Sequence, residues 1–150
     1  MQQSCGFRRF AITACALVML ALGACRAPDA EQAVRARIAD MQAAIDARDA
    51  GDVQALLAED FVGNDGLDRR GARQLAAGVF LRHRDVGARL GPVDVELRGE
   101  RDAIARFTVM ATGGSGGLLP ERGQVYQVET GWRRVGDEWR LLNASWEPVL

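Results

Sequence analysis

The apolar side chains between residues 31 and 50 recur at helical spacing. They are separated by four, three and four residues, which places all of them on one face of a helix. The residues concerned are Val34, Ile38, Met41 and Ile45. Gly51 is expected to end this helix, because glycine is common just beyond a helix C-terminus. The first predicted element is therefore an amphipathic helix over residues 31–50.

Two further helices and a set of strands follow from the rest of the pattern. Asp52 and Asp68 are each placed to cap a helix, the first a short one and the second one that runs to about His83. Apolar and polar residues then alternate, as in strands with one buried face. The predicted strands cover residues 93–98, 103–112, 124–134 and 139–147, and Phe61 and Val62 form a short extended piece. Three N-terminal helices packed on a curled antiparallel sheet make an α+β domain.

The last predicted hairpin divides into two faces. With Gly136 and Asp137 as its two-residue turn, Arg134 pairs with Trp139. The face expected to meet the helices carries large apolar side chains and a polar group gathered toward one end. Its members are Tyr126, Val128, Thr130, Trp132, Trp139, Leu141, Asn143, Ser145 and Glu147. The opposite face is expected to expose Leu142, Ala144 and Trp146, an apolar group suited to a homodimer contact.

The first 25 residues have the layout of a secretory signal. Two arginines precede an uncharged, mostly apolar run of 15 residues from Phe10 to Ala24, which is too short to span a bilayer. Cys25 directly after Leu-Gly-Ala resembles the bacterial lipoprotein signal, which implies cleavage before Cys25 and a lipid anchor on its thiol. We therefore predict a signal peptide over 1–24, a lipidated tether over 25–30 and one domain over 31–150. An aspartate directly after the cysteine would resemble an inner-membrane retention signal. This chain has Arg26 at that position, which favours the outer membrane, with the domain facing the periplasm.

Composition narrows the possible partners and chemistry. Cys5, Cys15 and Cys25 are the only cysteines, so the predicted domain has no thiol for a disulfide or a metal. Without a basic stripe, nucleic-acid binding is disfavoured. His83, the only histidine, is interpreted as a water-facing residue at a helix end rather than as a general base beside Asp85. We expect no metal and no cofactor.

Several segments resemble the nuclear-transport-factor-2-like superfamily, the cone-shaped fold that ketosteroid isomerases and polyketide cyclases share. They are the first helix, Asp49-Ala50-Gly51-Asp52 leading to Leu56-Leu57, Asp60-Phe61, and the hairpin from Gly131-Trp132-Arg133 to Glu138-Trp139-Arg140-Leu141. The resemblance covers residues 31–150. It implies a sheet wrapped around the long helix, with a pocket open at one end. Positions matching Asn143 and Ser145 line that pocket in many members of the superfamily.

The candidate pocket combines the hairpin face with one carboxylate from the segment after the second helix. Its residues are Tyr126, Thr130, Trp132, Asn143, Ser145, Glu147 and Asp60. A mostly apolar hollow with a few polar groups is typical of a small-molecule site. The other interpretation is that these groups bond to one another around an inert cavity. Asp60 with Asn64 and Asp65 would offer carboxylates at the rim, with burial raising the pKa of Asp60; for Asn64 and Asp65, turn capping is favoured.

Three functions stay open. The first is a non-catalytic, membrane-tethered binding or assembly module of the cell envelope. The second is an isomerase, dehydratase or cyclase that uses a carboxylate for proton abstraction. The third is a carrier for a small apolar ligand. The resemblance weakens the enzyme hypothesis, because the tyrosine that ketosteroid isomerases carry on the first helix is missing, and so are the histidines of the dehydratases. An epoxide-hydrolase-like site would need two acids bridged by an arginine, and nothing in the sequence places Arg106 inside the cone. The non-catalytic reading is therefore preferred.

Overall fold

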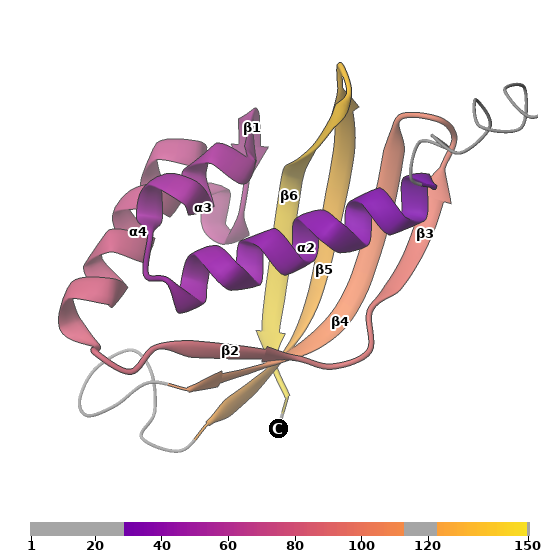
Figure 1. Ribbon diagram of the computed structural model, residues 1–150. Coiled ribbons are helices and arrows are strands. Elements are labelled where there is room, and N and C mark those ends of the chain that lie inside the picture. Colours follow the sequence, from indigo (N-terminus) through magenta and orange to yellow (C-terminus); the bar gives the residue numbers. More distant parts are fainter. Residues whose placement is uncertain (1–28, 113–122, 150) are drawn as a thin grey trace, which may run out of the picture.

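The computed structural model describes residues 29–112 and 123–149 (Figure 1). The helices are α2 (Ala30–Asp46), α3 (Ala50–Leu56) and α4 (Arg69–Arg82), with a single 3-10 turn, η1 (Asn64–Gly66). The strands are β1 (Leu57–Val62), β2 (Gly87–Leu90), β3 (Asp94–Arg98), β4 (Asp102–Thr112), β5 (Gln124–Val135) and β6 (Glu138–Pro148). The signal peptide over 1–24, Cys25 and the glycine-rich stretch 113–117 lie outside the described residues.

The boundary between the first two helices differs from the prediction. Helix α2 ends at Asp46, and Arg48 then adopts a positive φ of 58°. The Asp49 carboxylate accepts hydrogen bonds from the backbone N–H of Gly51 and of Asp52, at 2.8 and 2.9 Å, and so caps α3. Gly51 therefore lies inside α3 and Asp52 is not its cap. The free N–H groups at the start of α3 are already bonded to Asp49, three residues before Asp52, so Asp52 is not needed as the cap.

The cap of α4 is as predicted. The Asp68 carboxylate accepts a hydrogen bond from the backbone N–H of Gly71 at 2.6 Å. Helix α4 then runs for 14 residues to Arg82, close to the predicted end at His83. The capping aspartate is the sequence signal that locates this helix start.

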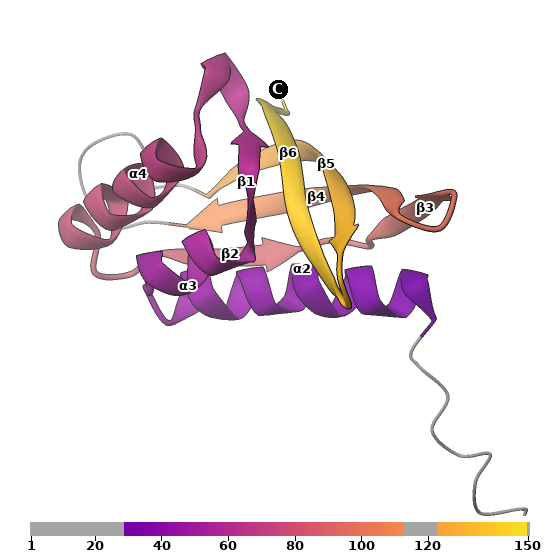
Figure 2. The ribbon, with the colours of Figure 1, turned by 90° about the horizontal axis from the view of Figure 1, so that it is seen from above.

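The six strands form one sheet in the order β1-β6-β5-β4-β2, with β3 also paired to β4. All pairs are antiparallel except β1 with β6, which are parallel, so the predicted all-antiparallel sheet is wrong at this edge. Strand β2 was not predicted; it pairs with β4 through Ala88 and Ala111. Helix α2 runs along one face of the sheet, here called the inner face, and the opposite one is the outer face (Figure 2).

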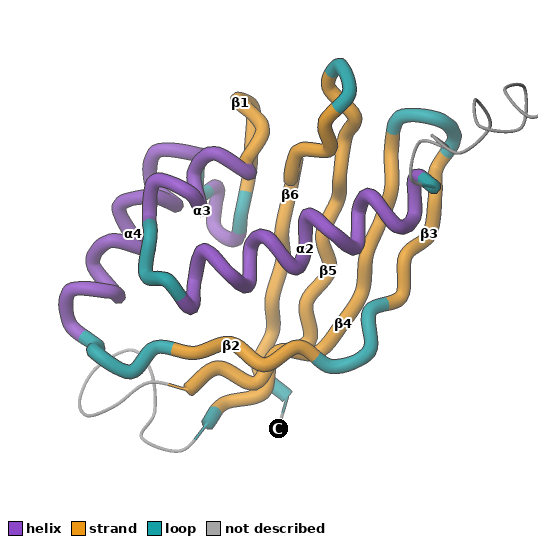
Figure 3. Tube along the Cα trace, viewed as in Figure 1, coloured by secondary structure: helices purple, strands orange, loops and turns teal. Residues whose placement is uncertain are grey.

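The space between α2 and the sheet is filled by side chains. Its buried members are Val34, Ile38, Leu57, Phe61, Ala103, Ala105, Trp132, Trp139 and Leu141. The small alanines of β4 leave room for the two indole rings beside α2. A smaller cluster of Ala44, Val53 and Phe80 joins α2, α3 and α4. Helices α3 and α4 gather at one end of the sheet beside β1, and the start of α2 and β3 lie at the other (Figure 3).

Candidate functional site

A β-bulge in β6 decides which side chains of the last hairpin meet the helices. Trp132 pairs with Leu141 as predicted, but Gly131 pairs with Asn143, so one extra residue of β6, Leu142, lies between these pairs. An extra residue shifts every later side chain to the other face. Thr130 consequently pairs with Ala144, and beyond the bulge β6 presents the alternate set of residues to the helices.

Three of the seven predicted pocket residues are therefore on the wrong face of β6. Asn143, Ser145 and Glu147 are exposed and belong to the outer face, which corrects the prediction that they line the cone. Ala144 and Trp146 are partly buried, and Ala144 packs against the core. The apolar outer patch expected from Leu142, Ala144 and Trp146 thus loses two of its three members. A homodimer through the outer face stays a prediction.

Thr130 and Trp132 do lie on the inner face, where they bond to each other. The indole Nε1–H of Trp132 donates to Thr130 Oγ1 at 3.0 Å, and the Thr130 hydroxyl donates to the carbonyl oxygen of Ala105 at 3.2 Å. All three residues are buried. Hydrogen bonds among buried polar groups of this kind stabilise a core and leave no donor for a ligand. Tyr126, further along β5, is partly buried and pairs with Pro148.

The shifted register builds a different site around Trp146. The Asn64 side chain holds the Trp146 backbone at two points: its Nδ2 donates to the carbonyl oxygen at 2.9 Å, and its Oδ1 accepts from the N–H at 3.3 Å. These bonds join η1 to β6. Beside them lies a hollow of about 510 Å³, here called the Trp146 hollow. It is lined by Asn64, Asp65, Gly66, Leu67, Asp68, Leu75 and Trp146.

The Trp146 hollow combines apolar and acidic groups. Leu67, Leu75 and the indole of Trp146 supply apolar surface, and Asp65 and Asp68 supply carboxylates. Both aspartates are exposed, and the Asp68 carboxylate caps α4. An aromatic face beside carboxylates attracts a cationic or hydrogen-bond-donating group. Asp65, in the left-handed conformation with φ 56°, fits the predicted turn role, while Asn64 instead bonds across to β6.

A second hollow, of about 540 Å³, lies where α2, α3 and the start of β6 meet. It is lined by Arg37, Asp40, Ala43, Ala44, Ala47, Asp52, Ala55, Leu56, Glu138 and Arg140. Its arginines are already paired: Arg37 bonds Asp40 and Glu138, and Arg140 bonds Glu138. The apolar part of its wall is mostly alanine, so it offers no aromatic surface. The Trp146 hollow is the better candidate.

Asp60 lies on the outer face. Its Oδ2 accepts a hydrogen bond from Arg133 Nη1 at 2.9 Å, and its side chain is 63% exposed. The hydrogen bond from Arg133 lowers the pKa of Asp60 below its ordinary value. The hypothesis of a buried carboxylate with a raised pKa is therefore wrong for Asp60.

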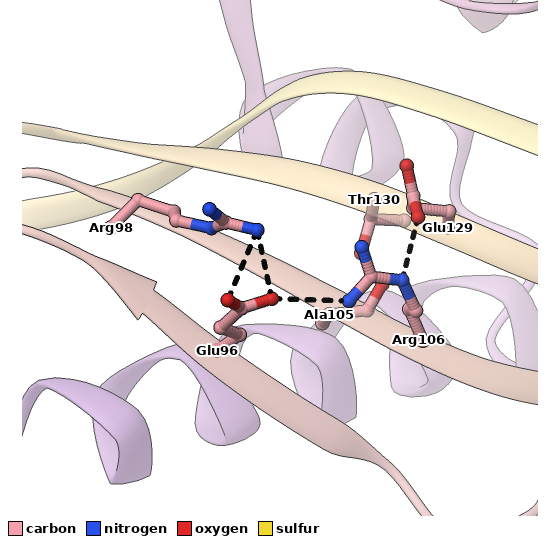
Figure 4. A network of polar contacts seen from close by, with 6 residues as sticks. All are labelled: Glu96, Arg98, Ala105, Arg106, Glu129 and Thr130. Atoms are coloured by element: carbon pink, nitrogen blue, oxygen red, sulfur yellow. Dashed lines mark hydrogen bonds and ion pairs between the residues drawn. The ribbon is translucent and has the colours of Figure 1, made fainter.

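The outer face carries a network of ion pairs across three strands (Figure 4). Arg106 bonds Glu129 through Nε at 2.7 Å and Glu96 through Nη1 at 3.3 Å, and Arg98 bonds Glu96 at 3.0 Å. The hydrogen bonds from Arg106 to Glu129 and Glu96 raise the pKa of the Arg106 guanidinium. Arg106 therefore serves the outer face and not the cone.

His83 is buried, with 2% of its surface exposed, which corrects the prediction that it faces water. Helix α4 ends at Arg82, and at His83 the backbone turns to an extended conformation while its N–H still donates to Val79. His83 is not among the residues that line the Trp146 hollow. Within residues 29–112 and 123–149, no group of three or more histidine, cysteine, aspartate or glutamate side chains is placed to hold a metal ion. None of the helices in these ranges is long and apolar enough to cross a membrane.

Known proteins resemble this chain in fold. A protein of the nuclear-transport-factor-2-like family from Streptomyces avermitilis superposes with a TM-score of 0.67 at 19% identity, over 80% of this chain and 96% of its own. Hexachlorocyclohexane dehydrochlorinase LinA-type3 from Novosphingobium barchaimii gives 0.65 at 14% identity, over 79% and 86%. Bd1075 from Bdellovibrio bacteriovorus gives 0.69 at 10% identity, over 79% of this chain and 40% of that one.

These similarities define the fold. This chain has the nuclear-transport-factor-2-like fold, an α+β domain with its helices against a curled sheet, as predicted. No family model matches the sequence, and no curated protein matches it. The identities of 10 to 19% show the fold alone, so activity has to be argued from the residues of this chain.

Proposed function

We propose that this chain is a lipid-anchored, non-catalytic binding module of a bacterial cell envelope, with the Trp146 hollow as its ligand site. The observation that carries the proposal is the two-point hydrogen bonding of Asn64 to the Trp146 backbone. It holds the Trp146 backbone against η1, and Trp146 lines the same hollow as two carboxylates, those of Asp65 and Asp68. The anchor is supported by the cysteine that follows Leu-Gly-Ala at the end of an apolar run.

The lining predicts the class of ligand. Leu67, Leu75 and Trp146 favour a small molecule with an apolar body, and Asp65 at the rim favours a cationic or hydrogen-bond-donating group on it. Two residues that the sequence offers for proton transfer lie outside the hollow, whose own carboxylates are Asp65 and Asp68. Asp60 pairs with Arg133 on the outer face, and His83 is buried at the end of α4. Binding without turnover therefore fits this arrangement best.

The ligand site is tested by native mass spectrometry of the chain purified in mild detergent from a crude cell extract. We expect a bound small molecule that is lost in Trp146→Ala and retained in Ser145→Ala. Ser145 is a matched control because it adjoins Trp146 in β6 but lies on the outer face. Far-UV circular dichroism checks that both variants are folded. An empty wild-type protein, or a ligand retained in Trp146→Ala, would contradict the site.

The anchor is tested separately by the intact mass of the mature protein. We expect the mass of a chain that begins at Cys25 with acyl groups attached, and we expect Cys25→Ser to stay unprocessed. A mature chain with an unmodified Cys25 would remove the anchor. That result would leave the ligand experiment unaffected, since the two proposals rest on different residues.

The alternative is an enzyme of the isomerase, dehydratase or cyclase kind. The similarity in fold to a protein named hexachlorocyclohexane dehydrochlorinase favours it. The discriminating variant is Asp65→Asn, which removes an exposed carboxylate of the Trp146 hollow. If the co-purified molecule is converted to a product and Asp65→Asn abolishes only the conversion, the enzyme hypothesis replaces the binding module. Bound but unchanged ligand in both proteins supports the binding module.

A further inference from the structure

Helix α4 lies at the end of the domain away from β3 and turns one face to the core (Figure 1). Phe80, on the inward side, packs with α2 and α3 in the smaller core cluster. The outward side carries a stripe of residues separated by three, four and four positions, which is the spacing of one helix face. Its members are Arg70, Arg73, Ala77 and Leu81. All but Ala77 are exposed, as is Arg84 just beyond the helix end, and this set is here called the α4 basic face.

The arginines of the α4 basic face are not neutralised by acids. Helix α4 contains no aspartate or glutamate. Every ion pair among the described residues uses an arginine of α2 or of the strands β3 to β6, so those of the α4 basic face have none. Arg70 shares a small hollow with Glu59 and Asp68, and therefore Arg73 and Arg84 carry the charge that is least compensated.

Leu81 adds apolar surface to these charges. Its exposed fraction is 86%, the largest of any large hydrophobic residue in the described ranges. It also lines a hollow of about 440 Å³ between α4 and the start of α3. The lining residues are Ala47, Arg48, Ala50, Ala77, Phe80 and Leu81. The only charged member, Arg48, donates to the carbonyl oxygens of Phe80 and Arg84 and so is held at the end of α4. The α4 basic face therefore places free cations around an apolar side chain that lies in water.

We infer that the α4 basic face binds the surface of a bilayer that contains anionic phospholipids. Guanidinium groups bind phosphate oxygens through paired hydrogen bonds, and an anionic leaflet attracts arginines that have no acidic partner. A leucine among such arginines is stabilised where the headgroups meet the acyl chains. A nucleic acid would match the charge of Arg73 and Arg84, but it offers no apolar phase to receive Leu81. The bilayer surface is the occupant that suits both properties of the face.

This contact is separate from the lipid anchor and from the Trp146 hollow. It uses no residue before α2 and none of the residues that line the Trp146 hollow. The arginines concerned form no run along the sequence, because the turns of α4 bring them to one side. That is why the basic face becomes visible only in the folded chain.

Photo-crosslinking to lipid tests the contact. The photoreactive residue p-benzoylphenylalanine is incorporated in place of Gln74, which is exposed on α4 beside Arg73, or in place of Ser145 on the outer face as the matched control. The full chain is purified in mild detergent and reconstituted with vesicles of phosphatidylcholine alone or of an equal mixture with phosphatidylglycerol. After irradiation, the intact mass gives the fraction of chains that carry a phospholipid adduct. This fraction can be measured whether or not Cys25 carries a lipid.

With the photoreactive residue at position 74, we expect at least about threefold more adduct on the anionic vesicles than on the zwitterionic ones, because only the anionic surface attracts the arginines. At position 145 the two kinds of vesicle should give the same yield. Raising the salt to about 1 M, where charges are screened beyond about 3 Å, should remove the difference at position 74. Equal yields at position 74 on the two kinds of vesicle would overturn the contact.

Variants of the chain show which residues carry the contact. Arg73→Gln/Arg84→Gln should abolish the excess of adduct at position 74 on the anionic vesicles. Arg98→Gln/Arg106→Gln removes the same charge from the outer face and should leave the excess unchanged. Far-UV circular dichroism checks that both are folded. A full excess in Arg73→Gln/Arg84→Gln would overturn the α4 basic face as the site. Leu81→Gln keeps the arginines and should lower the yield; an unchanged yield would overturn the part assigned to Leu81.

Discussion

The side chain of Asn143 lies directly over the backbone of Gly131. A Cβ placed on Gly131 would come within 2.6 Å of Asn143 Nδ2 and 2.7 Å of its Oδ1. The two residues pair at the bulge between β5 and β6, on the outer face. A larger residue here would therefore have to displace the Asn143 side chain. The same contact marks the point where the register of the hairpin changes.

This contact predicts an energetic coupling between the two positions. Gly131→Ala should lower the free energy of unfolding by about 1 kcal/mol more in the wild-type background than in an Asn143→Ala background, because only the first must displace the amide. Urea denaturation of the four proteins measures this difference. Gly78→Ala is the control, since nothing lies within 4 Å of a Cβ there. Equal effects of Gly131→Ala in both backgrounds would contradict the contact.

The buried hydrogen bond between Trp132 and Thr130 predicts a second change in stability. Thr130→Val keeps the volume but removes the acceptor of the Trp132 indole N–H, at a cost of roughly 1–3 kcal/mol in the free energy of unfolding. Thr130→Ser keeps a hydroxyl and should cost less. Thr108→Val, on the outer face of β4, is the matched control and should change stability little. A Thr130→Val protein as stable as the wild type would show that the indole N–H needs no acceptor here.

The three tryptophans are expected to respond differently to a quencher in solution. Trp132 and Trp139 are 2% and 3% exposed, whereas Trp146 is only partly buried. Acrylamide should therefore quench mainly the emission of Trp146, and Trp146→Phe should remove most of the quenchable fraction. A ligand in the Trp146 hollow should protect that fraction. Quenching that is unchanged in Trp146→Phe would mean that another indole is accessible.

The Asp60–Arg133 pair predicts a pH dependence. The hydrogen bond from Arg133 lowers the pKa of Asp60 in the folded chain, so the pair stabilises the fold above the unfolded-state pKa of about 3.9. This stabilisation is lost as the pH falls through the lower folded-state pKa. NMR titration of the Asp60 carboxyl should give a pKa below 3.9 in the wild type and a value near 3.9 in Arg133→Gln. Identical titration curves would contradict the pair.

Much of the fold is readable from the sequence because local signals specify it. The spacing of Val34 and Ile38 located α2, the carboxylate of Asp68 located the start of α4, and the turn at Gly136 fixed the first pairs of the last hairpin. Strand β2 was not predicted, since four residues with a single buried side chain carry no clear alternation. Its position depends on pairing with β4, which is a long-range contact.

The candidate site was less predictable, for one physical reason. A count of residues along β6 assumes that the strand has no bulge, and one extra residue at Leu142 exchanged the two faces beyond it. Thr130 and Trp132 lie on β5, which has no extra residue, and the face predicted for them is correct. Asn143 and Ser145 follow the extra residue in β6, and the face predicted for them is wrong. Gly131 opposite Asn143 is the available signal, because an isolated glycine within a strand often marks a bulge or a close approach.

The parallel pairing of β1 with β6 has a consequence for how the chain acquires its structure. Strand β1 directly follows the first two helices, but its partner is the last strand of the domain. The N-terminal half therefore cannot complete its edge until the C-terminal residues are available, so the order of synthesis cannot dictate the order of folding. A chain that crosses a membrane from its N-terminus would stay open until its final hairpin had emerged, and contacts this distant in sequence slow folding.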